Sequence, residues 1–143
     1  MSTEQNKAAE RRIFAELNKG NLAVVDELFA REYVYHVPGG IEVKGPEGFK
    51  QVMTMFSAAF PDFHMTIEDM IAEKDTVVTR WTISGTHKGD YAGIPATGKH
   101  VKVEGVLIAR FVDGKEVEAW DFFDRLSQYQ QLGVAPPLGQ AGT

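Results

Sequence analysis

The sequence contains no cysteine, so disulfides, thiolate nucleophiles and thiolate metal ligands are excluded. It also lacks any apolar run that approaches the length of a membrane span. The N-terminal stretch MSTEQNKAAERR is polar and charged where a secretory signal would be apolar. Together these absences predict a cytoplasmic protein in a reducing compartment.

Basic clusters are missing as well. The formal net charge is −5 and the lysines and arginines are scattered, which gives no reason to expect a nucleic-acid or acidic-membrane partner. The four histidines (His36, His64, His87 and His100) lie far apart, without the compact spacing of recognised zinc motifs. We therefore expect no metal site.

What is present is ordinary globular composition, with 43% hydrophobic and 24% charged residues in a chain of 143. That length suits one domain and is too short for two comfortable ones. We expect a single domain over residues 1–134 and a loose tail, APPLGQAGT, over residues 135–143.

The first part of the chain has helical periodicity. Apolar residues recur at helical spacing in three segments, and Pro46 suits the first position of the third helix. The predicted helices cover 3–19, 22–30 and a segment from Gly45 to just before Pro61. A short strand over 32–37 separates the second helix from the third.

After Pro61 the period changes to strict alternation, which predicts antiparallel strands. The predicted strands cover 63–72, 76–85, 99–111 and 116–123, with tight turns at Lys74-Asp75 and Asp113-Gly114. Helices first and strands afterwards are typical of an α+β fold. We expect three N-terminal helices packed on one curved, mostly antiparallel sheet, whose concave face forms a pocket.

The last predicted strand carries acids among aromatic residues. Alternation groups Val117, Ala119, Asp121 and Phe123 on one face, and Glu116, Glu118, Trp120, Phe122 and Asp124 on the other. Since the first face is apolar apart from Asp121, we expect it to line the pocket and Asp121 to have a raised pKa. Alternatively, Asp121 faces solvent. Asp124, at the strand's end, is either a second candidate acid or the cap of a following helix.

Two further positions bear on the pocket. Gly105 suggests a bulge that would turn Glu104 inward. Trp81 is expected in the core or in the pocket wall rather than as a specific cation binder.

Several short motifs, in this order, resemble the SnoaL-like polyketide cyclase (ester cyclase) family of the NTF2-like superfold. The resemblance runs from the helix of Phe14 to Gly133. Its most specific parts are Ala59-Phe60-Pro61-Asp62, Gly85-Thr86-His87-Lys88-Gly89, Gly93-Ile94-Pro95-Ala96-Thr97-Gly98-Lys99, Asp113-Gly114-Lys115, the residues Trp120, Asp121 and Asp124, and Gln131-Leu132-Gly133.

The resemblance implies an NTF2-like cone and a cofactor-free intramolecular aldol reaction. In the family, a carboxylate on the last long strand moves the proton, assisted by a histidine on the neighbouring strand. The carboxylate corresponds to Asp121. The histidine's position falls at Leu107, so this chain departs from the pattern, and His36 and His100 are the nearby substitutes.

The expected chemistry is proton transfer on a small, largely apolar, carbonyl-bearing substrate. Asp121 would remove an acidic proton next to a carbonyl, and a second polar group would stabilise the enolate oxygen. The candidates for that group are His36, Tyr35, Tyr33 and His64. The substrate is expected between Phe123, Trp81 and Phe56.

Two other functions stay open. A cofactor-free hydratase or epoxide hydrolase would need Arg80 or Arg110 to share the pocket with Asp121. A non-catalytic module would only bind a small ligand or dimerise, and would tolerate loss of Asp121. In either case we expect a homodimer through the outer sheet face, because Trp120, Phe122, Val106 and Ile108 would otherwise be exposed.

Overall fold

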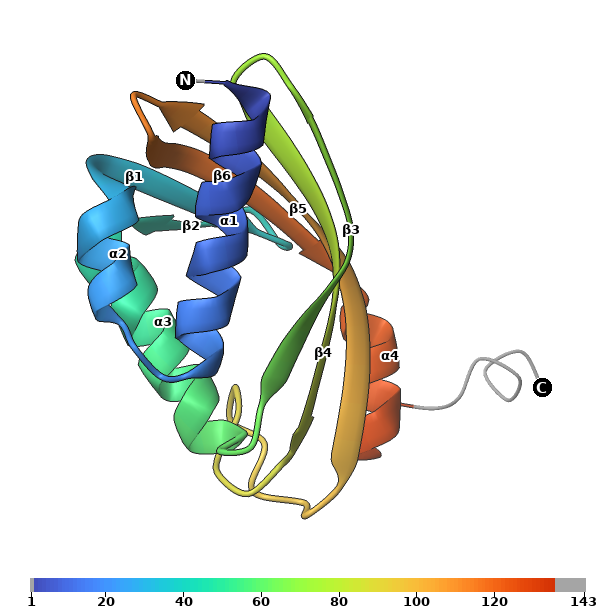
Figure 1. Cartoon of the computed structure of the whole chain (residues 1–143). Helices are drawn as coiled ribbons and strands as arrows, with labels where there is room; N and C mark the ends of the chain where they lie inside the picture. The colour runs from blue at the N-terminus through green and yellow to red at the C-terminus, as the bar shows by residue number, and fades with distance from the viewer. Residues whose placement is uncertain (1, 136–143) are drawn as a thin grey trace.

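The computed structural model describes residues 2–135 and shows helices packed against one strongly bent sheet (Figure 1). The helices are α1 (Thr3–Asn18), α2 (Ala23–Leu28), α3 (Gly45–Ala59) and α4 (Arg125–Leu132). The strands are β1 (Phe29–Val37), β2 (Ile41–Lys44), β3 (His64–Glu73), β4 (Thr76–Thr86), β5 (His100–Val112) and β6 (Lys115–Phe123). The predicted tail lies outside the described residues, apart from its first residue.

The sheet has the strand order β2-β1-β6-β5-β4-β3. Every neighbouring pair is antiparallel except β1 and β6, which run parallel. The two longest strands, β4 and β5, pair without interruption from Thr76 opposite Arg110 to Thr86 opposite His100. The predicted α+β fold with a curved, mostly antiparallel sheet is therefore confirmed.

Helices α1, α2 and α3 lie on one side of the sheet, and α4 follows β6 and packs along β5 (Figure 1). The ends of the helices follow from local chemistry. Ser2 caps α1 through a reciprocal capping box with Gln5, and Pro46 occupies the first turn of α3. No helix within residues 2–135 is long and apolar enough to cross a bilayer.

The main core lies between the helices and the concave face. It includes Phe14 and Leu17 from α1, Phe49 from α3 and the central strand residues Val77 and Ala109. A smaller cluster around Phe60, Val101 and Leu132 closes the other end, beneath α4. A cavity remains between these two clusters, and the site is built there.

The structure contains two elements for which the prediction gave no residue range, strand β2 and helix α4. It also shortens the second helix, which ends at Leu28 because the chain is already extended at Phe29. The bulge predicted at Gly105 is wrong, since β5 pairs with β4 in continuous register there and Glu104 stays exposed. The register shift lies instead between Arg110 and Phe111, where β5 pairs with β6.

That shift changes which acids of β6 face inward. Phe111 lies opposite Glu116, and Arg110 lies opposite Glu118, so Val117 is the extra residue of a bulge. Glu116 therefore joins Ala119, Asp121 and Phe123 on the concave face in place of Val117. The predicted face was right from Ala119 onward and wrong at its first position.

Candidate active site

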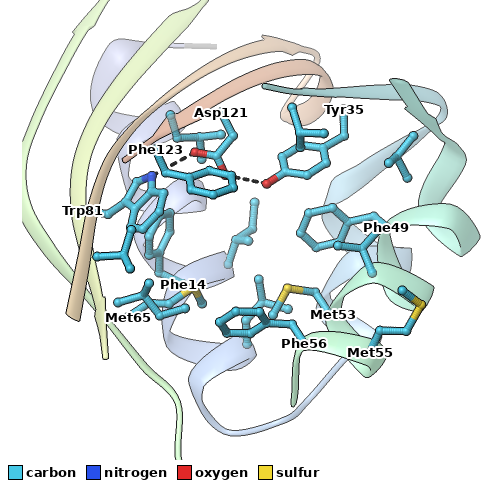
Figure 2. A pocket seen from close by; sticks show the side chains of 18 of the residues that line it. Phe14, Tyr35, Phe49, Met53, Met55, Phe56, Met65, Trp81, Asp121 and Phe123 are labelled. Carbon is cyan, nitrogen blue, oxygen red and sulfur yellow. Dashed lines mark hydrogen bonds between the residues drawn. The ribbon is translucent and has the colours of Figure 1, made fainter. Parts of the chain in front are cut away.

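A cavity of about 690 Å³ opens between the helices and the concave face of the sheet. Its size falls in the range usual for small-molecule sites. Most of its wall is apolar, and the larger side chains are shown in Figure 2: Phe14, Phe49, Met53, Met55, Phe56, Met65 and Phe123. Asp121, Tyr35 and Trp81 lie together at one side, opposite Phe56 and Met55 (Figure 2).

Asp121 is the polar centre of this wall. Its Oδ1 accepts a hydrogen bond of 3.0 Å from the indole Nε1 of Trp81, and its Oδ2 accepts one from the hydroxyl of Tyr35 (Figure 2). Burial raises the pKa of Asp121 from 3.8 to about 6, although both hydrogen bonds act to lower it. A carboxyl with this pKa is ionised at neutral pH and still basic enough to take a proton.

Three strands bring these groups together. Tyr35 stands on β1 opposite Ala119 of β6, one inward position from Asp121. Trp81 stands on β4 opposite Gly105 of β5. A Cβ at position 105 would overlap the indole ring and lie 2.7 Å from the carbonyl oxygen of Phe122. Gly105 is therefore needed for the close approach of Trp81, which explains a glycine in the middle of a long strand.

Tyr35 is a fixed donor. Burial, and then the charge of Asp121, raise its pKa well above 10.0, so the hydroxyl keeps its proton. Its ring packs edge-on against Phe49 at 5.2 Å between ring centroids. The tyrosine therefore presents one well-oriented hydroxyl to the carboxylate.

Leu107 occupies the position directly across from Asp121 in the β5–β6 pair, and it lines the cavity. An isobutyl side chain carries no proton that it could transfer. The strand on which the resemblance places the assisting histidine, β5, therefore offers Asp121 no polar side chain at this position. Tyr35 and Trp81, from β1 and β4, provide the polar contacts instead.

Six of the predicted site residues line this same cavity. They are Asp121, Tyr35, Phe56, Trp81, Leu107 and Phe123. Tyr33, a further candidate, also lines it.

The structure places His36 elsewhere. Its side chain is on the outer face of the sheet, because it neighbours Tyr35 on β1 and alternation turns it away. The ring stacks on Trp120 at 5.2 Å, and Nε2 lies 2.7 Å from Oε2 of Glu118. Glu118 also accepts a hydrogen bond of 3.2 Å from Arg110. His36 belongs to a surface network and is not positioned to act with Asp121.

His64 and Asp124 are also outside the cavity. His64 is exposed at the start of β3, in a separate, mostly polar pocket with His100 and Lys102. Asp124 is exposed and caps α4 by accepting a hydrogen bond of 3.0 Å from the backbone N–H of Ser127. The capping alternative for Asp124 agrees with this geometry.

The arginines bear on the hydratase alternative. Arg80 is exposed and Arg110 pairs with Glu118 on the outer face, so neither shares the cavity with Asp121. A different arginine does line it. Arg125, the first residue of α4, lies over the ring of Phe123 at 5.0 Å, and its buried Nε has no hydrogen-bond partner.

Sequence reasoning missed Arg125 and two buried acids, Glu10 and Glu116. Glu10 stands four residues before Phe14 and seven before Leu17, so helical spacing could have found it on the inner stripe of α1. No comparable signal exists for Glu116, because its orientation depends on the bulge at Val117. Within residues 2–135, no three histidine or acidic side chains are grouped so as to hold a metal ion.

Comparisons with known proteins agree with this architecture. The family model described as SnoaL-like polyketide cyclase matches residues 8–132. The aklanonic acid methyl ester cyclase DauD of Streptomyces sp. (strain C5) is 33% identical over 133 residues, which cover 89% of this chain and 81% of DauD.

Solved structures are similar over nearly the whole chain. AclR from Streptomyces galilaeus, a proposed hydroxylase, matches with a TM-score of 0.85 and 30% identity over 94% of this chain and all of its own. IdmH from Streptomyces antibioticus, a proposed polyketide cyclase, matches with a TM-score of 0.81 and 31% identity over 91% of this chain and 99% of its own.

Proposed function

Because the chain belongs to the SnoaL-like polyketide cyclase family, we propose that it closes a ring in a polyketide ester by a cofactor-free intramolecular aldol reaction. One observation carries the proposal. The Asp121 carboxylate lies in an apolar cavity, oriented by Tyr35 and Trp81 and with its pKa raised to about 6. A base of this kind suits the removal of a proton next to a carbonyl.

The proposed reaction balances without a co-reactant. Asp121 takes a proton from a carbon next to a carbonyl, leaving an enolate. The enolate carbon attacks a ketone carbon of the same molecule, a C–C bond forms and the ketone oxygen becomes an alkoxide. The alkoxide then takes the proton back from Asp121. Substrate and product are isomers, and the carboxylate is regenerated.

Tyr35 and Trp81 orient the base in this scheme. Two donors on separate oxygens fix the plane of the carboxylate, and the rigid wall holds the substrate at a reactive distance. A neutral tyrosine hydroxyl can also donate to an oxygen that gains charge as the proton leaves. The Tyr35 hydroxyl would thereby take over part of the role that a histidine has in the family.

The cavity also suggests the class of substrate. Flat aromatic and methionine side chains line it, which suits a planar, polycyclic ketone. DauD is named for aklanonic acid methyl ester, and the two chains align over 89% of this one. We therefore propose an aromatic polyketide methyl ester as the substrate.

Arg125 is proposed to orient the substrate's polar end. It is a cation on a largely apolar wall, and no carboxylate forms an ion pair with it among the described residues. A guanidinium in this position favours an ester carbonyl or an acidic hydroxyl of the substrate. Stacking on Phe123 keeps it at the wall.

The test is turnover of aklanonic acid methyl ester by purified, dialysed protein with no added cofactor, followed by chromatography and mass spectrometry. The proposal expects a product of unchanged mass with one more ring. A product heavier by one oxygen would instead indicate hydroxylation, as suggested for AclR. Tight binding without turnover, here and with related polyketide esters, would favour the non-catalytic module.

A further inference from the structure

Besides the groups around Asp121, the cavity has a second set of polar side chains in its wall. Arg125 and Gln128 come from α4, and Tyr91 comes from the loop between β4 and β5; all three line the cavity. Arg125 and Gln128 are three residues apart on one helix, so they lie on the same face of α4. Arg125, Gln128 and Tyr91 are called the second polar site below.

Arg125 is a cation that has no anionic partner. Within residues 2–135, no carboxylate forms an ion pair with its guanidinium, and its buried Nε has no hydrogen-bond partner. Asp90 also lines the cavity, but its side chain is exposed and its Oδ1 accepts a hydrogen bond of 3.2 Å from the backbone N–H of Gly93. A partly desolvated guanidinium is stabilised when a ligand brings a negative charge to it.

Gln128 places an uncharged donor beside the guanidinium. Its side chain is only 3% exposed, and both polar atoms of its amide meet the hydroxyl of Tyr91, at 3.2 Å for Nε2 and 3.4 Å for Oε1. That hydroxyl uses only part of the amide's capacity for hydrogen bonds, because the amide nitrogen alone has two N–H groups. The amide can therefore also donate to a ligand in the cavity.

We propose that the second polar site binds a planar, negatively charged group with two neighbouring oxygens, either a carboxylate or an ionised hydroxyl next to a ring carbonyl. The flat guanidinium fork can donate two parallel hydrogen bonds to such a pair of oxygens. For the polyketide ester, this inference rests on the proposed function and makes it more specific. The ester lies at Asp121, and the anionic group lies at Arg125.

The spacing of the two polar sites suits one elongated ligand. Asp121 and Phe123 are successive inward residues of β6, and such residues lie about 7 Å apart along a strand. The guanidinium carbon of Arg125 lies 5.0 Å from the centre of the Phe123 ring. The two polar sites are thus roughly 10 Å apart, with an aromatic ring between them. A flat polycyclic molecule that lies along Phe123 can reach both.

Charge also determines which way round such a ligand binds. The Asp121 carboxyl, with its pKa of about 6, is mostly ionised at neutral pH and repels an anionic group. Arg125 attracts the same group at the other end of the Phe123 ring. The anionic end of the ligand is therefore directed to α4, and the uncharged end is directed to the base.

The test is the binding of unreactive anthraquinones, measured by calorimetry at about pH 7.5, where a carboxyl group is ionised. Anthraquinone-2-carboxylate carries the charge, and its methyl ester is a neutral analogue of similar shape. The wild type should bind the carboxylate about 10- to 100-fold more tightly, as expected for hydrogen bonds to a charged group. Arg125→Gln should remove this preference. Arg125→Lys should keep only part of it, because an ammonium group has the charge without the fork.

Alizarin distinguishes the two sources of the negative charge, because it has hydroxyls beside a ring carbonyl and changes colour when it ionises. If the ligand is an ionised hydroxyl, binding to the wild type should lower the pKa of alizarin by about one pH unit, and Arg125→Gln should remove the effect. A preference for the carboxylate without this change would identify the ligand as a carboxylic acid. Either result supports the second polar site.

Arg80→Gln is the matched control, since Arg80 is exposed and does not line the cavity. Its affinities should equal those of the wild type. The proposal would be overturned if neither charged probe bound, or if the wild type showed no preference for the carboxylate and no effect on alizarin. Effects that persist in Arg125→Gln would also overturn it. If that variant fails to fold, Arg125→Lys decides, because an undiminished preference there would exclude the fork.

These probes separate the inference from the proposed function, because they contain no acidic proton on a carbon next to a carbonyl. Asp121→Asn should therefore keep the preference for the carboxylate. A preference in a protein that turns over no polyketide ester would sustain the second polar site and reject the cyclase. Turnover of the ester by a protein that binds neither charged probe would sustain the cyclase and reject the second polar site.

Discussion

At the scale of single residues, the proposed chemistry of the cavity depends on the two hydrogen bonds that Asp121 accepts. Tyr35 and Trp81 lower the pKa of the carboxyl, and burial raises it more. The balance leaves a group that titrates near pH 6 and is mostly ionised at neutral pH. Activity should therefore rise with pH through this value.

Tyr35→Phe tests the first of these bonds. Without the hydroxyl, Asp121 loses a donor to its charged form, so its pKa should rise above about 6 and the acidic limb of kcat/KM should move up. A hydrogen bond to a charged group contributes about 1.5–3 kcal/mol, so turnover at pH 6 should fall at least about tenfold. The measurement is a pH–rate profile.

Tyr129→Phe is the control for this change, since Tyr129 packs against the smaller core cluster and does not line the cavity. Its profile should match the wild type. An unchanged acidic limb in Tyr35→Phe would mean that the Tyr35 hydroxyl does not stabilise the carboxylate.

The sequence allowed most of the residues around Asp121 to be predicted, because aromatic and acidic side chains alternate cleanly over the second half of β6. It did not allow their partners to be chosen. Tyr35 and His36 are adjacent, and only the strand's orientation in the sheet shows that Tyr35 faces inward and His36 faces Glu118. That orientation is set by the parallel pairing of β1 with β6, which involves residues distant in the chain.

At the scale of elements, the end of β6 separates two aspartates that the sequence could not tell apart. The side chain of Asp121 faces the cavity on the concave side of the sheet, whereas Asp124 is the N-cap of α4. Asp124→Ala should lower the free energy of unfolding by about 1 kcal/mol, as is typical for the loss of a capping side chain. Turnover at a temperature where the variant is folded should stay close to that of the wild type.

Thermal unfolding and a turnover assay on the same sample check this prediction. Asp124→Asn is the control, because asparagine also caps helices well. A large loss of turnover in Asp124→Asn, with stability retained, would make Asp124 the acid and reverse the assignment.

Element boundaries could be predicted where a regular alternation continues over many residues, as in β4 and β5. They could not where a register shift intervenes. The bulge at Val117 has no residue signal of its own, whereas Gly105, which resembles a bulge signal, instead makes room for Trp81. Local patterns thus predict which residues alternate, and only pairing between strands decides where the alternation slips.

At the scale of the whole molecule, three buried acids govern how stability depends on pH. Folding raises the pKa of Asp121, Glu10 and Glu116, so the folded chain holds more protons than the unfolded chain once the pH exceeds the unfolded values of 3.8 and 4.5. Stability must therefore fall as pH rises through this window to the folded values. Urea unfolding should give a lower free energy at about pH 7.5 than at about pH 5, by on the order of 2 kcal/mol.

The double variant Glu10→Gln, Glu116→Gln should flatten this dependence, leaving only the part due to Asp121. A wild-type protein that is more stable at the higher pH would show that these acids are not buried in solution.

The outer face of the sheet predicts a second property of the whole molecule. Phe122 is 56% exposed, and Trp120, Val106 and Ile108 are half-buried beside it. We propose that a second copy covers this face. Light scattering should give twice the mass of the 15.9 kDa chain. The Phe122→Lys variant should have the mass of a single chain. A monodisperse wild-type monomer at high concentration would contradict the dimer.

The most direct test of the account is the effect of Asp121→Asn on turnover of aklanonic acid methyl ester. Asparagine keeps the shape of the side chain and accepts a hydrogen bond, but it cannot take the proton. We expect kcat to fall by roughly 10² to 10⁴, the range typical for loss of a general acid/base, while ligand binding changes little. Full turnover by Asp121→Asn would contradict the central claim that this carboxylate moves the proton.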